Sequence, residues 1–299
     1  MAWPTDRRPS DALTGELVPE LWSSRIINHV RSYLCCAQVV NTTWKDQLHK
    51  GDKVYIPVST TISTSTVDPT TTNKIPSSGV TTTFTTTTAS ISIDRWDQAI
   101  IQIDDSVKVQ TQAPAFYAQK ASDAAYAIEK VVDTSVNTLF ASLASAVYGS
   151  DGQTFTDDIL VAMMEVLDEA DVPRSDRAII ADPSMLADCY KIDKFMSYDY
   201  GKNPLGHIPS EAGTGGYRGT IVAYNLPLYI TNNLVAPASA GAYGALLHKD
   251  AIGLVIQSAP SIEKDRSAAA ASDLLYVRCL SGDAIVRDTF GYCFYTRKA

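Results

Sequence analysis

The sequence predicts a fold of the α+β class in which helices and strands are interleaved and no unit repeats. Three observations lead to this prediction. Apolar residues recur at helical spacing through residues 114–148, β-branched segments dominate the residues before that stretch, and short apolar runs separated by turn formers dominate the residues after it.

Composition limits the function classes. The chain has 299 residues, enough for a substantial core and for two lobes. Hydrophobic residues make up 45% and charged residues 19%, a globular composition whose low charge indicates that partner proteins cover part of the surface. The net charge is −8 and no run of lysine or arginine occurs, which argues against specific nucleic-acid recognition.

No secretory or membrane segment is predicted. The N-terminal residues lack the apolar core of a signal peptide, and no stretch approaches the roughly 18 apolar residues of a membrane span. We therefore expect the protein to be made and kept in a cytosol.

The chain begins with two predicted elements. Residues 1–20 are polar and rich in proline, which favours an extended arm. Apolar residues then recur at three- and four-residue steps, which predicts a short amphipathic helix. These residues are Leu21, Trp22, Ile26, Ile27, Val30, Tyr33 and Leu34.

A threonine-rich excursion follows. Residues 53–57, 89–94 and 98–103 are predicted strands, and nearly half of residues 59–88 are threonine. An isolated ribbon is marginal in water, so we expect a long hairpin whose tip lies on a neighbouring subunit. A disordered linker is the alternative, although disorder does not favour β-branched residues.

The helical spacing after Pro114 continues to Gly149, which predicts a single long helix of about 50 Å. A second lobe follows, with a helix from the N-cap Thr156 to Ala170, a strand at residues 177–181, and a helix capped by Asp182. The glycine-rich residues 200–219 predict a mobile loop. Further short strands are predicted at 220–224, 228–231, 245–248, 253–257, 274–280 and 292–296.

This order of elements resembles the HK97-type major capsid proteins of tailed bacteriophages, over nearly the whole chain. The most specific stretch is residues 159–173, which end in Val-Pro, followed by residues 177–183, which begin with arginine and end in Asp-Pro. Residues 17–22, 51–57 and 219–227 are similar to other recurring family stretches. The hairpin departs from the family in its lack of charge, which puts in doubt the ion pairs that such hairpins often make with a neighbouring helix.

The resemblance implies a division of the chain. It places an N-terminal arm and short helix at 1–45, an E-loop hairpin at 46–105, a peripheral domain with a spine helix at 106–150, an axial domain at 151–250 and returning β segments at 251–299.

The resemblance also implies function. The expected role is a capsid subunit that assembles with itself into hexamers and pentamers of an icosahedral shell around double-stranded DNA. Assembly would occur in the host cytoplasm and the product would be the virion. Scaffolding protein, portal and decoration protein are the expected partners, with non-specific contact to packaged DNA and no membrane.

We expect no catalytic, cofactor-binding or metal-binding residues and no enzyme activity. The five cysteines are odd in number and lack C-x-x-C spacing, which favours buried free thiols. The four histidines, at 29, 49, 207 and 248, lack metal-ligand spacing.

Other motif matches are attributed to chance. Ser261 and Lys264 fit S-x-x-K without its companion motifs, and residues 213–216 lack the lysine of a phosphate loop. The acidic pairs at 104–105 and 157–158 belong to a strand, where they face opposite ways, and to a helix start. A tail-tube or decoration protein would be mostly β without the long helix, and a hydrolase would need a nucleophile and base that the motifs do not supply.

Overall fold

The computed structural model describes residues 34–44, 51–59, 70, 86–106, 115–143, 147–196, 206–208, 217–221, 224–236 and 241–297. The predicted arm, most of the predicted N-terminal helix and most of the threonine-rich segment lie outside these residues. The described part mixes helices and sheets, so the predicted α+β class is confirmed.

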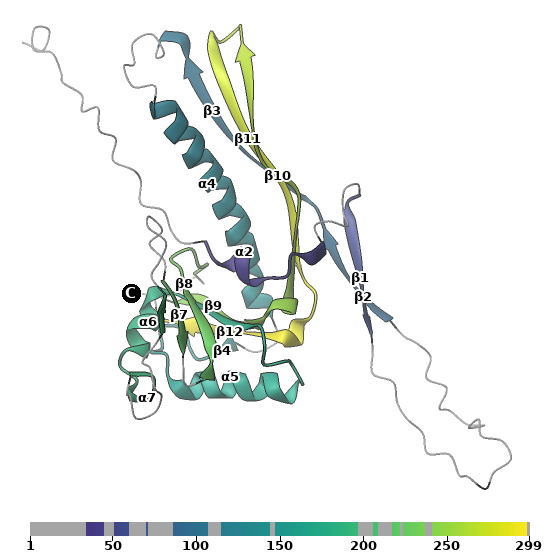
Figure 1. Ribbon diagram of the computed structural model, residues 1–299, viewed down its shortest axis with the longest axis vertical. Helices are drawn as coiled ribbons and strands as arrows, with labels where there is room; N and C mark the ends of the chain where they lie inside the picture. Colours follow the sequence, from purple (N-terminus) through teal and green to yellow (C-terminus); the bar gives the residue numbers. More distant parts are fainter. Residues whose placement is uncertain are drawn as a thin grey trace, which may run out of the picture.

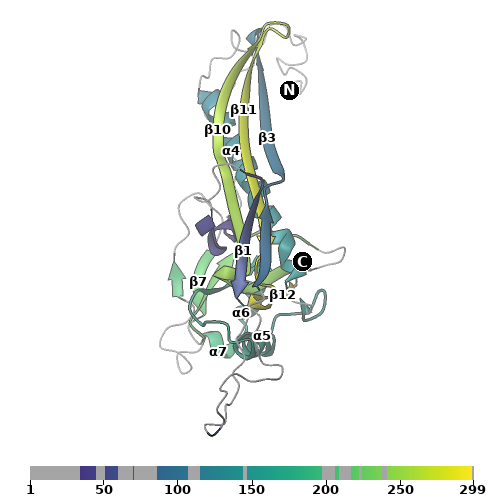
Figure 2. The same ribbon diagram turned by 90° about the vertical axis from the view of Figure 1, so that its right-hand side faces the viewer.

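The molecule has an elongated part and a compact part (Figure 1). In the elongated part a long helix runs beside a three-stranded sheet, and in the compact part helices cover a seven-stranded sheet. A two-stranded hairpin projects to the side of the elongated part, and the view in Figure 2 shows how narrow the long sheet is.

The compact sheet has the order β4-β12-β9-β5-β8-β7-β6. Its strands are β4 (Val147–Tyr148), β5 (Arg177–Ala181), β6 (Gly206–Ile208), β7 (Tyr217–Ile221), β8 (Leu226–Ile230), β9 (Ala242–His248) and β12 (Gly291–Thr296). The accompanying helices are α5 (Asp157–Glu169), α6 (Pro183–Cys189) and α7 (Asp193–Met196), with short 3-10 turns η4 (Lys249–Ala251) and η5 (Asp288–Phe290). The sequence predicted a mobile loop at residues 200–219. This prediction was wrong for β6 and β7, which pair with each other as antiparallel strands through their backbones despite the glycines.

Strand β5 is buried along its whole length because both faces of the compact sheet are covered. Ile179 and Ala181 join a core cluster with Leu160 of α5. Ala178 and Ile180 point the other way, into the cluster beneath the long helix. The compact sheet thus lies between α5 and the base of the elongated part.

The passage from α5 to α6 follows the prediction closely. α5 begins after Thr156, and the Asp182 side chain accepts a hydrogen bond from the backbone N–H of Ser184 at 3.1 Å. Arg177 is 2% exposed and donates to the carbonyls of Pro173 and Val172, at 3.0 and 2.5 Å. The arginine of the family-like stretch therefore satisfies carbonyl groups just beyond the end of α5.

The elongated part combines α4 (Ala115–Thr138) with the antiparallel strands β10 (Ile252–Ser267), β11 (Ser272–Ile285) and β3 (Arg95–Asp104) in the order β10-β11-β3. Ile128, Val132 and Val136 of α4 are buried in the core cluster that includes residues of β10 and β11. β10 extends far beyond the short strand predicted at 253–257. Its second half is exposed and polar, so backbone pairing with β11 rather than apolar spacing defines it.

The long helix is shorter than predicted. α4 ends at Thr138, followed by the 3-10 turn η2 (Leu139–Ser142) and then β4, whereas the sequence predicted one helix to Gly149. Phe140 and Leu143 are fully buried in the same cluster as α4, so the apolar spacing continues past the change in backbone. Thr138 Oγ1 also donates to the Ser135 carbonyl at 2.6 Å, a local bond that competes with helix continuation.

A buried carboxylate joins three segments near the lower end of α4. Asp133, 1% exposed, accepts from the N–H of Ala37 and from Asn233 Nδ2, both at 3.0 Å. Ala37 belongs to the short helix α2 (Cys36–Val39), and Asn233 belongs to the segment after β8. Burial raises the pKa of Asp133, against the opposing effect of these donors.

The hairpin consists of β1 (Lys53–Ser59) and β2 (Thr86–Ser92), paired antiparallel from Lys53 with Ser92 to Ser59 with Thr86. β3 does not continue the hairpin and pairs with β11 instead. A small cluster of Val54, Ile91 and Val255 fixes the hairpin base. Gly282 is required there, because a Cβ at this position would lie 2.0 Å from the Ser92 carbonyl oxygen.

Candidate interaction surfaces

The cysteines are buried packing residues rather than reactive thiols. All five are free and buried, and burial raises the pKa of Cys189 and Cys293 to about 12. At neutral pH these thiols stay protonated and unreactive.

His248 is also a packing residue. It is 5% exposed, its Nδ1 accepts from the Asp250 N–H at 3.2 Å, and its ring meets Phe290 edge to face. Burial lowers the pKa of His248. His29 and His49 lie outside the described residues, as does the side chain of His207.

The remaining motifs do not converge. Ser261 and Lys264 are exposed on β10, and residues three apart in a strand face opposite sides. Asp105 pairs with Arg266, and Asp157 pairs with Lys194. Residues 213–216 lie outside the described part of the chain.

Within the described residues, no three histidine, cysteine, aspartate or glutamate side chains gather in a way that could hold a metal ion. In the same part of the chain, no helix is long and apolar enough to cross a membrane.

The side of the long sheet turned away from α4 carries exposed apolar side chains. Burial alternates along β3, and the outward positions include Trp96, 65% exposed, and Ile100, 52% exposed. Gln98, between these two residues, and Gln102, after them, point to the same side. We call this side the outer sheet face. The sequence predicted a strand at 98–103 but Trp96 was missed, although Trp96, Gln98 and Ile100 follow one another at two-residue steps, the spacing of one strand face.

β11 extends the outer sheet face. Leu280 lies opposite Trp96, Tyr276 opposite Ile100, and Arg278 between them. The Arg278 guanidinium stands 4.7 Å from the Tyr276 ring centroid and also pairs with Glu263 of β10 at 3.0 Å. Aromatic and arginine side chains of this kind are enriched at protein interfaces.

The two edges of the long sheet differ. The edge strand β10 carries Glu263, Lys264 and Asp265 along its exposed half, and edge charges oppose pairing with another strand. β3, at the other edge, has an uncharged run from residue 98 to residue 103. The β3 edge is therefore the more open to a second chain.

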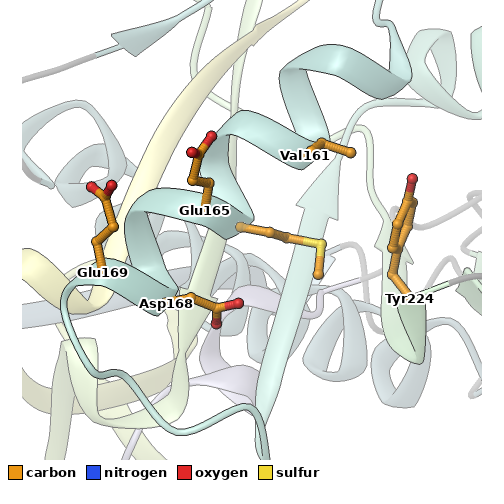
Figure 3. Close-up of a pocket in the computed structure, with 6 residues that line it drawn as sticks. Val161, Glu165, Asp168, Glu169 and Tyr224 are labelled. Atoms are coloured by element: carbon orange, nitrogen blue, oxygen red, sulfur yellow. The ribbon is translucent and has the colours of Figure 1, made fainter.

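The outer side of α5 bears a shallow groove of about 710 Å³. Val161 of α5 faces Tyr224 across it, while Glu165 and Glu169 project from the helix nearby (Figure 3). Met164 also lines the groove. Val161 is 44% exposed. This acidic and apolar groove lies in the compact part, away from the outer sheet face.

A second groove, of about 460 Å³, lies on α4 beside β3. It is lined by Arg95, Ala127, Lys130, Val131, Thr134, Ser135 and Thr138. Arg95 is anchored there by Asp283, at 3.1 Å, and Ser281, at 3.2 Å.

The sequence matches no protein-family model and no curated protein. Solved structures do match. A chain from Mycobacterium phage Che8 superposes with a TM-score of 0.74 at 20% identity, over 94% of this chain and 98% of that one. A chain in the capsid structure of cyanophage P-SCSP1u gives 0.68 at 16% identity, over 95% and 94%.

A third match comes from the mature capsid of bacteriophage PhiM1, with a TM-score of 0.67 at 13% identity, over 93% of this chain and 91% of that one. These likenesses run through both the elongated and the compact part, because each spans more than nine-tenths of both chains. The chain therefore has the fold of phage capsid chains.

Proposed function

We propose that the protein is the major capsid subunit of a tailed bacteriophage and assembles with itself into hexamers and pentamers of an icosahedral shell. The observation that carries the proposal is the likeness to phage capsid chains along nearly the full length of both partners. An exposed outer sheet face with Trp96 and Ile100 supports it, because a soluble monomer has little reason to expose such a row.

The proposed subunit is of the HK97 type. α4 corresponds to the spine helix of a peripheral domain at 106–150, and the hairpin β1–β2 to the base of an E-loop at 46–105. The compact sheet corresponds to the axial domain at 151–250. Residues 251–299 return through both parts, since β10 and β11 pair with β3 while β12 joins the compact sheet. Residues 1–45 would supply the arm.

Assembly follows from many modest contacts. The hairpin projects from the body and carries Tyr55, 66% exposed, so it can reach a neighbouring subunit and lie against its outer sheet face. Each such contact needs only modest affinity, because several neighbours act together in a closed shell. Because each single contact is weak, a wrongly placed subunit can also dissociate while the shell grows.

The proposed location is the virion, after assembly in the host cytoplasm. Scaffolding protein, portal and decoration protein are the proposed partners, with non-specific contact to packaged DNA. The proposed role is structural rather than enzymatic. The long helix α4 argues against a tail-tube or decoration protein.

The proposal is tested by weakening the outer sheet face. The double variant Trp96→Ser, Ile100→Ser should remain folded by circular dichroism, because both side chains are already exposed, yet fail to form fast-sedimenting particles when co-expressed with the scaffolding protein. Val161→Ser, on α5, is the matched control and should assemble like the unaltered protein. Normal particles from the double variant would contradict the assigned interface, and absence of particles from the unaltered protein would contradict the function.

A further inference from the structure

The open edge of the long sheet presents its backbone groups at regular positions. β3 has β11 on one side and no strand of the described residues on the other (Figure 2). Just beyond the pairing of Asp104 with Ser272, the Asp105 N–H donates to the Ala271 carbonyl at 3.0 Å. In an antiparallel pair, residues bonded to the partner strand alternate with residues whose N–H and C=O point away from it. The odd-numbered residues of β3 therefore bond to β11, and the even-numbered ones point their backbone groups to the open edge.

Three of the even-numbered residues form a short palindrome. Gln98 and Gln102 lie two residues before and after Ile100, and all three side chains belong to the outer sheet face. A two-fold axis through Ile100 would place Ile100 opposite its own copy and Gln98 opposite Gln102 of the second chain. Each such pair can exchange two backbone hydrogen bonds. The outer sheet faces of both copies then lie on the same side of one joined sheet, because the paired residues all point that way.

The side chains of the palindrome also suit a second copy. Ile100 is 52% exposed, and pairing would cover it with the same side chain of the second chain. Gln102 Nε2 donates to Asp104 Oδ1 at 3.1 Å, so Gln102 Oε1 can accept a hydrogen bond from the Gln98 amide across the axis. Residues 98–103 carry no charge that pairing would desolvate. The edge therefore complements itself in both its backbone and its side chains.

Acidic residues on either side of this run select the register. An axis at residue 99 would bring Asp94 opposite Asp104 of the second chain. An axis at residue 101 would bring Asp97 opposite Asp105. Like charges directly opposite each other destabilise strand pairing. An axis through Ile100 places none of these acids opposite another acid.

We propose that the β3 edge is a two-fold interface at which the β3 strands of two copies pair antiparallel about Ile100 and join the two long sheets into one. A second copy is the occupant because the edge complements itself. The pairing uses the backbone of β3 and leaves the outer sheet face available to a neighbouring hairpin. Its place in a shell rests on the proposed function: a two-fold contact pairs chains and cannot close a ring, so it would connect one ring of subunits to the next.

The first test is a disulfide across the axis, made in the full-length chain. Ile100→Cys should give a disulfide-linked dimer under mild oxidation, because the Cα atoms of such a pair lie about 5.5 Å apart, within reach of a disulfide. Ile262→Cys is the matched control, since Ile262 is 53% exposed on β10 at the charged edge of the same sheet, and should give no such dimer. The five native cysteines are buried and should not compete.

The register is tested by two further variants. An equimolar mixture of Gln98→Cys and Gln102→Cys should give a linked dimer, whereas neither variant should link to itself, because each residue would lie about 14 Å from its own copy. Links of equal yield in the mixture and in the separate variants would contradict the axis at Ile100.

The affinity of the contact gives an independent measurement. Sedimentation equilibrium of the soluble subunit should show a monomer–dimer equilibrium, and Ile100→Lys should raise its Kd at least about tenfold, because two lysines would face each other across the axis. Ile262→Lys should leave the Kd unchanged. An unaltered subunit that stays monomeric at its highest soluble concentration, or equal cross-linking of Ile100→Cys and Ile262→Cys, would overturn the proposal. The links can be scored on free subunits and on shells alike, so an absence of shells would contradict only the proposed function.

Discussion

Two arginines bind the same carboxylate, but they differ in burial and in their contacts with backbone carbonyls. Asp168 receives Arg177 and Arg174, each at 2.7 Å, and the side chain of Arg177 is 1% exposed while that of Arg174 is 79% exposed. Both hydrogen bonds lower the pKa of Asp168. The sequence predicted a strand that begins at Arg177, but the role of its guanidinium could not be predicted, because it depends on where the carbonyls of Val172 and Pro173 fall in space.

Arg177→Leu should therefore lower the free energy of unfolding by about 2–4 kcal/mol, since it leaves two carbonyls without their donor. Arg174→Leu should change it by less than about 0.5 kcal/mol, because exposed pairs contribute little. Urea denaturation of the unassembled subunit measures both. Equal effects of the two substitutions would contradict this role of the Arg177 guanidinium.

Asp133 should make stability depend on pH. Its pKa is raised on folding by burial, so the folded state holds the proton more tightly than the unfolded state, and Asp133 lowers the free energy of unfolding as pH rises above 3.8 toward the folded value. Asp157 and Asp168, whose pKa values are lowered, act in the opposite direction.

The difference in unfolding free energy between the unaltered protein and Asp133→Asn isolates this effect. As pH rises through that window, the unaltered protein should lose free energy of unfolding relative to Asp133→Asn. A difference that is constant with pH would show that Asp133 does not titrate on folding.

Gly282 holds the hairpin base against β11. Gly282→Ala should cost about 1–3 kcal/mol, because its Cβ would clash with backbone that cannot swing aside. Gly291→Ala should cost less, since its Cβ would meet side chains at 3.1–3.2 Å. Thermal unfolding of the two variants compares them, and a smaller effect at residue 282 would contradict the close approach.

At the scale of elements, the sequence predicted those whose signals are local. The helices after Thr156 and Asp182 begin where the sequence predicted, although only the Asp182 side chain makes a capping hydrogen bond, and buried β5 was predicted with its observed bounds. The end of α4 was missed because the 3-10 turn keeps Phe140 in the same core. The outer half of β10 was missed because its strand structure comes from pairing with β11.

The hairpin tip should serve assembly rather than folding. Replacing residues 60–85 by Asn-Gly would join Ser59 to Thr86, which already face each other in register, through a two-residue turn. The free energy of unfolding should change by less than about 0.5 kcal/mol, because the base cluster of Val54, Ile91 and Val255 remains. Particle formation, followed by sedimentation, should be lost, and closed shells from this variant would contradict the assembly role.

At the scale of the whole molecule, the order of elements along the chain predicted the fold better than any single motif did. The elongated and compact parts are joined by one continuous core beneath α4, which contains Ile180 of the compact sheet and Val277 of the long sheet. No local pattern predicts that β3 crosses to β11, because the two strands are far apart in sequence and pair through the backbone. The outer sheet face therefore became visible only in the folded chain.

The proposed function requires this chain to build a closed shell. Electron microscopy of the expressed protein, with and without its scaffolding protein, tests this requirement most directly. We predict icosahedral particles or tubular lattices of hexamers in at least one of the two conditions. Protein that stays monomeric in both conditions would contradict the capsid function.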